Sequence, residues 1–274
     1  MDKIIRALIC GGQVSLTVLE TTALVNEAVK IHKTGENASR ILGGALTCGA
    51  YLASCLKEES GSVSLTVKAA EGDGAVSVSA DKELHVRGYA DGSCTQTLAG
   101  GTFTVVREDG YSRPFCGTCE IAGDNISDIL ETYFGQSEQI PTAAAITTEF
   151  AGGKCASAGG VVMQLLPDAS EEMIWEASDI FDQYKTRYVD GGKVLDAREI
   201  FDGLFAPYLS GGVTTLFPEY RCNCSEKKIR GVLATVGKEE LLKICEEEGC
   251  VKVHCHYCNT DYTYDKESIG ELFK

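Results

Sequence analysis

The stretches Arg221-Cys222-Asn223-Cys224-Ser225 and Cys255-His256-Tyr257-Cys258-Asn259 decide how the C-terminal part of this chain folds. Each contains a cysteine pair, C-x-C in the first and C-x-x-C in the second, and so short a spacing directs both sulfurs toward one point. Two such pairs supply the four thiolates of a tetrahedral site. Thiolates favour zinc, Cu(I) or iron–sulfur, and this paired layout best matches zinc. The sequence therefore predicts one zinc ion bound by Cys222, Cys224, Cys255 and Cys258.

The module around these cysteines, residues 219–274, is too short to hold itself together with a hydrophobic core alone. Structural zinc contributes about 10–16 kcal/mol in comparable peptides, so the metal supplies much of the fold. A purely structural zinc site explains the same spacing. His254 and His256 flank the second pair, and we expect them to lie beside the metal shell or on the surface. Cys245 and Cys250 are extra thiols, interpreted as bystanders, with alternative ligands or oxidation partners as the other possibility.

The charge of the whole chain excludes several classes of partner. The 274 residues carry a formal net charge of −15, which repels phosphate backbones and anionic lipid and argues against nucleic acid and membrane surfaces. No N-terminal signal is visible after Met1, and the uncharged run from Ile41 to Leu56 is too short and too rich in small residues to span a bilayer. We therefore expect a soluble cytoplasmic protein.

Thirteen cysteines without a secretory signal favour reduced thiols and metal binding over a disulfide scaffold. Five of them lie among apolar or small residues and are expected to be inert packing residues: Cys10, Cys48, Cys55, Cys94 and Cys155. Cys116-Gly-Thr-Cys119 is a second C-x-x-C, for which a thioredoxin-like site is the alternative. Such a site opens a helix after a parallel strand, whereas this pair follows Pro114-Phe115 in a β-rich region.

The first 167 residues predict an α+β domain of antiparallel strands with packed helices. Residues 4–10 and 14–19 are predicted to form a hairpin, and Thr21 or Thr22 is expected to cap the helix that follows it. Residues 38–57 predict a buried helix rich in small side chains. Alternating residues from 62 to 106 predict an antiparallel meander. Gly152-Gly153-Lys154 lacks the order of a phosphate loop and is expected to be a hairpin turn.

Residues 168–218 predict a helical linker between this domain and the zinc module. Asp168-Ala-Ser-Glu171 and Asp196-Ala-Arg-Glu199 are capping-box patterns, and Leu195 with Ile200 has the spacing of a hydrophobic staple. The predicted organisation is thus a core domain at 1–167, a helical linker at 168–218 and a four-cysteine zinc domain at 219–274. An apolar stripe follows the first linker helix and comprises Met173, Ala177, Ile180, Phe181, Tyr184 and Tyr188.

The zinc module suggests a redox switch. If an oxidant formed disulfides within each pair, zinc would leave and two very short loops would replace one long one. The module would then unfold, and loss of its packing would free the linker and uncover its apolar face. Exposed apolar surface binds other apolar surface, which is the logic of an oxidation-activated chaperone.

Several motifs, spread in order along the chain, resemble those of the heat shock protein 33 family of redox-regulated chaperones. They are Ala38-Ser-Arg-Ile-Leu-Gly43, Arg87-Gly-Tyr-Ala90, Tyr133-Phe-Gly-Gln-Ser-Glu-Gln-Ile-Pro141, Gly159-Gly-Val-Val-Met-Gln164 with Pro167, and Arg221-Cys-Asn-Cys-Ser225. The resemblance implies that Cys222, Cys224, Cys255 and Cys258 bind zinc in the reduced, inactive protein. It also implies that peroxide with mild heat, or hypochlorite, converts them to the disulfides Cys222–Cys224 and Cys255–Cys258.

By the same resemblance, the oxidised protein unfolds its linker, forms a homodimer and holds unfolding or misfolded client proteins without ATP. The Cys116/Cys119 and Cys245/Cys250 pairs depart from the family pattern and leave open a different order of oxidation or disulfides outside that pattern. No Ser/His/Asp constellation, paired-carboxylate site or open zinc site is visible, so no enzyme is predicted. The alternatives are a thiol oxidoreductase at Cys116/Cys119, a zinc ribbon for nucleic acid, which the charge disfavours, and a zinc protein that resists oxidants.

Overall fold

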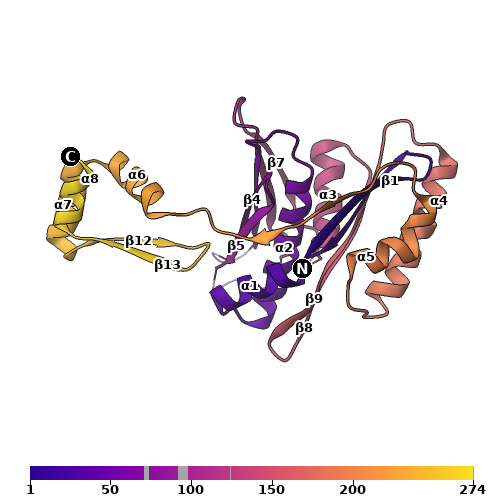
Figure 1. Cartoon of the computed structure of the whole chain (residues 1–274), viewed down its shortest axis with the longest axis horizontal. Helices are drawn as coiled ribbons and strands as arrows, with labels where there is room; N and C mark the ends of the chain where they lie inside the picture. The colour runs from indigo at the N-terminus through magenta and orange to yellow at the C-terminus, as the bar shows by residue number, and fades with distance from the viewer. Residues whose placement is uncertain (71–73, 92–97, 124, 274) are drawn as a thin grey trace. The chain divides into compact units, whose positions relative to one another are not determined.

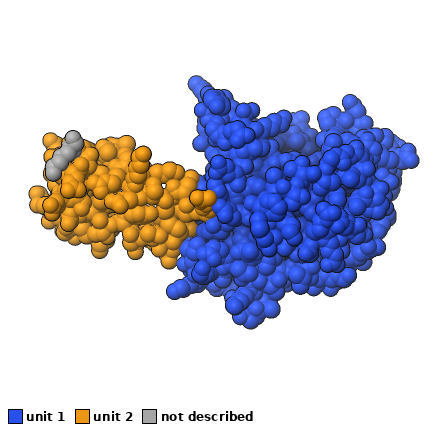
Figure 2. Space-filling model, in the orientation of Figure 1, with its two compact units in different colours: residues 1–220 blue, residues 221–274 orange. Residues whose placement is uncertain are grey.

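The computed structural model describes residues 1–70, 74–91, 98–123 and 125–273. They form two compact units, Met1–Tyr220 and Arg221–Lys274 (Figure 2). Cys94, one of the five cysteines expected to be packing residues, lies outside the described residues. The segment 168–218 belongs to the first unit, and its role as a separate linker stays a prediction.

The first sheet of unit 1 is antiparallel and has the strand order β10-β1-β2-β9-β8. The predicted N-terminal hairpin is confirmed as β1 and β2, and the predicted turn at Gly152-Gly153 joins β8 to β9. Gly152 (φ 60°) and Gly153 (φ 77°) have the left-handed backbone that a two-residue hairpin turn requires. The strands are β1 (Lys3–Ile9), β2 (Val14–Glu20), β8 (Thr142–Ala151), β9 (Lys154–Leu165) and β10 (Thr214–Leu216).

Both faces of this first sheet are covered. Ile4 packs into one hydrophobic core and its neighbour Ile5 into another, because successive strand residues point to opposite faces. The second core is closed by helix α4 (Glu171–Tyr184), π-helical turn η2 (Lys185–Val189), helix α5 (Ala197–Ile200), π-helical turn η3 (Phe201–Phe205) and the short 3-10 turn η4 (Ala206–Tyr208). In Figure 1, α4 and α5 lie beside β1 on the face away from α2. The predicted apolar stripe from Met173 to Tyr188 therefore faces the sheet.

The sequence predicted the N-cap of α5 correctly and that of α4 wrongly. Asp196 caps α5 as expected, accepting hydrogen bonds from the backbone N–H groups of Arg198 and Glu199, both at 2.9 Å. The assignment of Asp168 as the cap of α4 was wrong. Asp168 has a left-handed backbone (φ 64°), and Ser170 is the N-cap, its hydroxyl accepting from Met173 N–H at 3.4 Å. The single tryptophan, Trp175, lies on the outside of α4 and is 76% exposed.

The second sheet has the order β11-β5-β4-β3-β6-β7. The predicted simple meander was wrong beyond β5, because β6 pairs with β3 and makes β3 central. All neighbours are antiparallel except β11, which runs parallel to β5. The strands are β3 (Ser62–Lys68), β4 (Ala75–Asp81), β5 (His85–Ala90), β6 (Thr102–Glu108), β7 (Phe115–Glu120) and β11 (Glu219–Tyr220).

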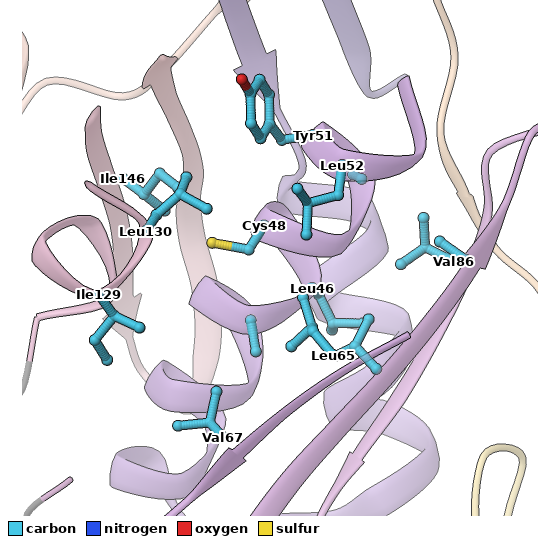
Figure 3. Packing of buried hydrophobic residues seen from close by; sticks show 14 of the residues in the cluster. Leu46, Cys48, Tyr51, Leu52, Leu65, Val67, Val86, Ile129, Leu130 and Ile146 are labelled. Carbon is cyan, nitrogen blue, oxygen red and sulfur yellow. The ribbon is translucent and has the colours of Figure 1, made fainter. Parts of the chain in front are cut away.

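Helix α2 (Glu36–Ser54) fills the main core of unit 1, with α1 (Thr22–His32), α3 (Ile126–Tyr133) and π-helical turn η1 (Phe134–Glu138) around it. Figure 3 shows Leu46, Cys48 and Leu52 of α2 among side chains of the second sheet and α3. A Cβ atom at Gly49 would lie 2.6 Å from Val78 Cγ1, so glycine is what lets α2 approach β4 so closely. None of the helices among the described residues has the length and apolarity to cross a membrane.

Unit 2 is small and has a correspondingly small core. Helices α6 (Glu226–Val236), α7 (Lys238–Glu248) and α8 (Lys266–Leu272) pack with the hairpin β12 (Val251–Cys255) and β13 (Thr260–Tyr264). Helices α6 and α7 both lie between the two cysteine pairs. Six residues are buried in this core: Leu233, Leu241, Cys245, Val251, Tyr264 and Ile269.

Candidate metal centre

Two local structures position the four predicted cysteines. Cys222 and Cys224 lie in the irregular segment just before α6, which Ser225 caps by accepting a 3.3 Å hydrogen bond from Lys228 N–H. Cys255 ends β12 and Cys258 lies in the turn that leads to β13. That turn is closed by a 2.8 Å hydrogen bond from Asn259 N–H to the Cys255 carbonyl, with Asn259 in the left-handed region (φ 54°). The hairpin tip therefore presents both of its sulfurs to the preceding segment.

The four sulfurs fit a tetrahedral metal ion. All lie within 4.8 Å of one another, Cys222 Sγ is 3.7 Å from Cys255 Sγ, and Cys224 Sγ is 3.2 Å from Cys258 Sγ. Zinc–sulfur bonds of ~2.3 Å at tetrahedral angles place sulfurs about 3.8 Å apart, inside this range. All four thiols are partly buried, and within the described ranges they are the only group of three or more potential ligands brought so close. The structure thus supports a four-cysteine metal site.

Hydrogen bonds reach three of the four sulfurs from outside the thiol group. Cys222 Sγ accepts from Cys224 N–H at 3.4 Å, the Tyr262 hydroxyl is 3.3 Å from Cys224 Sγ, and the Thr260 hydroxyl is 3.2 Å from Cys258 Sγ. Burial raises the pKa of Cys222 and of Cys258. Burial acts the same way on Cys224, but hydrogen bonds from Tyr262 and the neighbouring thiols outweigh it and lower the pKa of Cys224 to about 7. A thiolate at Cys224 is therefore accessible near neutral pH.

The flanking residues lie where the sequence analysis expected them. His254 Nδ1 pairs with Asp261 Oδ1 at 2.7 Å across the hairpin, and the His254 and His256 rings meet edge to face at 5.0 Å between centroids. Neither histidine belongs to the four-sulfur group. Cys245 is buried in the small core, with its sulfur 3.7 Å from the Tyr264 carbonyl, and Cys250 is partly exposed; both are outside the group as well.

The Cys116/Cys119 pair has the wrong geometry for a dithiol site. Both residues lie on strand β7, where Cys116 is exposed and Cys119 is buried against the core. Three steps along a strand span about 10 Å, beyond the ~7 Å Cα separation that a disulfide tolerates. The pair opens no helix, which argues against the thioredoxin-like alternative.

The packing role predicted for other cysteines holds for three of them. Cys10, Cys48 and Cys155 are buried, and burial raises their pKa values to about 12, 12 and 11. Cys55 is partly buried.

Sequence reasoning missed Tyr262 and Thr260, because only the register of the β12–β13 hairpin reveals that their hydroxyls meet the sulfurs.

Comparisons with known proteins agree with this architecture. A family model described as Hsp33 protein matches residues 2–265. The 33 kDa chaperonin of Clostridium botulinum (strain 657 / Type Ba4) is 29% identical, with 100% of this chain and 97% of the relative covered. That of Clostridium perfringens (strain SM101 / Type A) is 31% identical, with 100% and 92% covered.

Among solved structures, the 33 kDa chaperonin (heat shock protein 33 homolog) of Thermotoga maritima superposes with a TM-score of 0.82 at 24% identity, covering 99% of this chain and 97% of the other. This likeness confirms the predicted α+β fold with its antiparallel sheets. The curated relatives are named chaperonins, so the family is one of chaperones and not of enzymes. Its model matches almost the full length of this chain, which therefore belongs to the Hsp33 family.

Proposed function

We propose that this chain is a redox-regulated, ATP-independent holdase chaperone of the cytoplasm. It is inactive with zinc bound and active after oxidation, when it protects unfolding proteins from aggregation under oxidative stress. One observation carries the proposal: four thiols lie within 4.8 Å of one another in a unit whose core has six buried residues among the described part of the chain. A bound metal then stabilises the fold of that unit, and the thiolates that bind the metal are the groups that react with oxidants.

The chemistry assigned to the four thiols is a two-electron oxidation of each pair. Zinc, when bound, keeps the sulfurs as thiolates and ties the segment before α6 to the hairpin. Two thiolates and one hydrogen peroxide give one disulfide and two hydroxide ions, so two peroxides convert all four cysteines. We assign the disulfides Cys222–Cys224 and Cys255–Cys258, which leave no sulfur free to bind metal.

The pairing decides whether unit 2 unfolds. In the structure the close sulfur contacts run across the site, Cys222 to Cys255 and Cys224 to Cys258. Disulfides along those contacts would keep the segment before α6 linked to the hairpin. Disulfides within each motif close very short loops and leave the two motifs unlinked. The proposed pairing therefore removes the cross-link between the two motifs, and a core with so few buried residues is too small to hold the unit together without it.

The proposed client-binding form exposes apolar surface from unit 1. Segment 168–218 contributes Ile180, Tyr184 and Phe205, each 0% exposed, to the core over the first sheet. Release of this segment as a linker would uncover these side chains and the sheet residues beneath them, including Ile5 and Leu16. Unfolded clients present the same kind of surface, and two oxidised chains would bury part of it as a homodimer.

The experiment is suppression of aggregation of a chemically unfolded client, followed by light scattering. The zinc-loaded reduced protein is compared with protein pre-treated with peroxide at elevated temperature or with hypochlorite. We expect suppression only after oxidation, release of one zinc per chain and peptide maps with the two disulfides named above. Equal activity in both samples, or none in either, would reduce the centre to a structural zinc site.

Cysteine variants sharpen this test. Cys258→Ser removes one ligand and should lose both the stable zinc site and the reversible oxidative switch. Cys245→Ser is the matched control, because Cys245 lies in the same unit but outside the four-sulfur group. A Cys245→Ser protein that no longer switches would contradict the assignment of the four thiols.

A further inference from the structure

The Tyr262 hydroxyl meets the metal centre from the far strand of the hairpin. Its oxygen is 3.3 Å from Cys224 Sγ, a contact between residues 38 positions apart. Strand β13 is held in register by pairing of Tyr262 with Val253 of β12. The hairpin therefore fixes the backbone of Tyr262, and its side chain packs against the small core of the unit, while its partner Cys224 belongs to the separate segment before α6.

A metal-bound thiolate has no proton to give, so in that state the phenol O–H must be the donor. When the phenol O–H donates to the sulfur, it engages a lone pair with which the thiolate would otherwise attack an electrophile. It also fixes the direction of the Cys224 side chain, since the phenol itself is held by the strand. Partners of this kind, one step removed from a metal, commonly change metal affinity by about 10–100-fold.

We propose that Tyr262 is a positioning residue that orients Cys224 as a metal ligand and restrains the reaction of its sulfur with oxidants. This inference rests on the proposed function, because it assigns to Tyr262 part of the control of the same switch. The other contacts to the centre differ in kind or target: Cys222 accepts from a backbone N–H, and the Thr260 hydroxyl lies beside Cys258.

The restraint acts on a defined step with hydrogen peroxide as oxidant. The Cys224 thiolate attacks one peroxide oxygen, an S–O bond forms, the O–O bond breaks and hydroxide leaves. Sulfur is oxidised by two electrons to a sulfenic acid, and a second thiolate then displaces hydroxide from it to form the disulfide. The attack of the Cys224 thiolate on peroxide uses a sulfur lone pair that accepts the Tyr262 O–H hydrogen bond. This hydrogen bond must therefore weaken before the S–O bond can form.

Tyr262→Phe removes the hydroxyl and keeps the ring. Tyr264→Phe is its matched control: Tyr264 lies two positions along the same strand, is 3% exposed, and its hydroxyl has no hydrogen-bond partner among the described residues. Two quantities are measured on full-length reduced protein. They are zinc affinity by competition with a chromogenic chelator, and the rate of peroxide oxidation at each cysteine by quenched alkylation and mass spectrometry.

For Tyr262→Phe we expect zinc affinity to fall about tenfold and oxidation of Cys224, together with its proposed disulfide partner Cys222, to accelerate severalfold, ahead of any change at Cys255 or Cys258. Tyr264→Phe should match the wild type in both. Thr260→Val provides a second test, because the Thr260 hydroxyl lies 3.2 Å from Cys258 Sγ and any change in oxidation rate must fall on Cys258 and not on Cys224. Thr260→Ser, which keeps a hydroxyl, should restore the wild-type rate.

Uniform acceleration at all four cysteines, or the same change in Tyr264→Phe, would show loosening of the unit and overturn the assignment. Wild-type zinc affinity and Cys224 rate in Tyr262→Phe would overturn it as well, whatever the chaperone assay shows. If the wild type proves insensitive to oxidants while Tyr262→Phe still binds zinc more weakly, the proposed switch fails and the positioning role of Tyr262 stands.

Discussion

The carboxylate of Asp2 accepts a 2.7 Å hydrogen bond from the backbone N–H of Leu24, 22 positions further along the chain. Its other oxygen accepts from Ala23 N–H at 2.9 Å, so Asp2 satisfies two free donors at the start of α1. Thr21 occupies the N-cap position but makes no side-chain cap; its hydroxyl is 2.7 Å from that of Thr47. The expectation that Thr21 or Thr22 caps this helix was therefore wrong in its chemistry.

Asp2→Ala should destabilise unit 1 by about 1–2 kcal/mol, because two backbone N–H groups lose their acceptor in a buried place. Urea unfolding at neutral pH, followed by circular dichroism, measures this loss. Glu59→Ala, in an exposed loop, is the control and should leave the transition midpoint unchanged. A midpoint for Asp2→Ala equal to that of the control would contradict the long-range cap.

Asp196 should make stability depend on acid pH. Hydrogen bonds from Glu199 N–H and Arg198 N–H hold the pKa of its carboxyl below the ordinary value of 3.8. Its contribution is therefore complete above the unfolded value and is lost as pH falls through the folded value. Asn caps helices without titrating, so Asp196→Asn should lose less stability than the wild type between about pH 5 and pH 3. Parallel pH profiles of the urea midpoint for the two proteins would refute this role.

Gly49→Ala should destabilise unit 1 by about 1–2 kcal/mol in spite of the better helix propensity of alanine. The new methyl group would lie 2.6 Å from Val78 Cγ1 and force α2 away from β4. Gly231→Ala in α6 meets nothing within 4 Å and should instead stabilise its helix by up to about 1 kcal/mol. Amide hydrogen exchange resolved by peptide measures both units at once, and the two substitutions should change protection in opposite directions.

Alkylation should sort the thiols of the folded, zinc-loaded protein by burial. Cys116 is exposed and should react first, whereas burial raises the pKa values of Cys10 and Cys48 to about 12 and that of Cys155 to about 11. These three should stay unmodified at neutral pH until the chain is unfolded, because the thiolate is the reactive form. Pulse labelling with a maleimide and mass spectrometry gives the order, and modification of native Cys48 as fast as Cys116 would disprove it.

What the sequence predicted correctly is local. The β1–β2 and β8–β9 hairpins follow from alternating side chains on either side of paired glycines, and the buried helix expected at 38–57 is α2 at Glu36–Ser54. The four-cysteine group follows from spacing within two short motifs. What the sequence did not reveal depends on distant pairing. β6 joins β3 across a long connection, Asp2 caps α1 from its position just before β1, and Tyr262 reaches Cys224 only through hairpin register.

The exposure of Trp175 determines what fluorescence can report about this protein. Trp175 is already 76% exposed while α4 is folded, so unfolding of α4 changes the polarity around the indole only slightly. A small shift of the emission maximum on oxidation is therefore the expected signal even if the whole helix melts. Covering the indole with a client or a second copy would move the emission to shorter wavelength. The one intrinsic tryptophan is thus a sensor of association and an insensitive probe of unfolding.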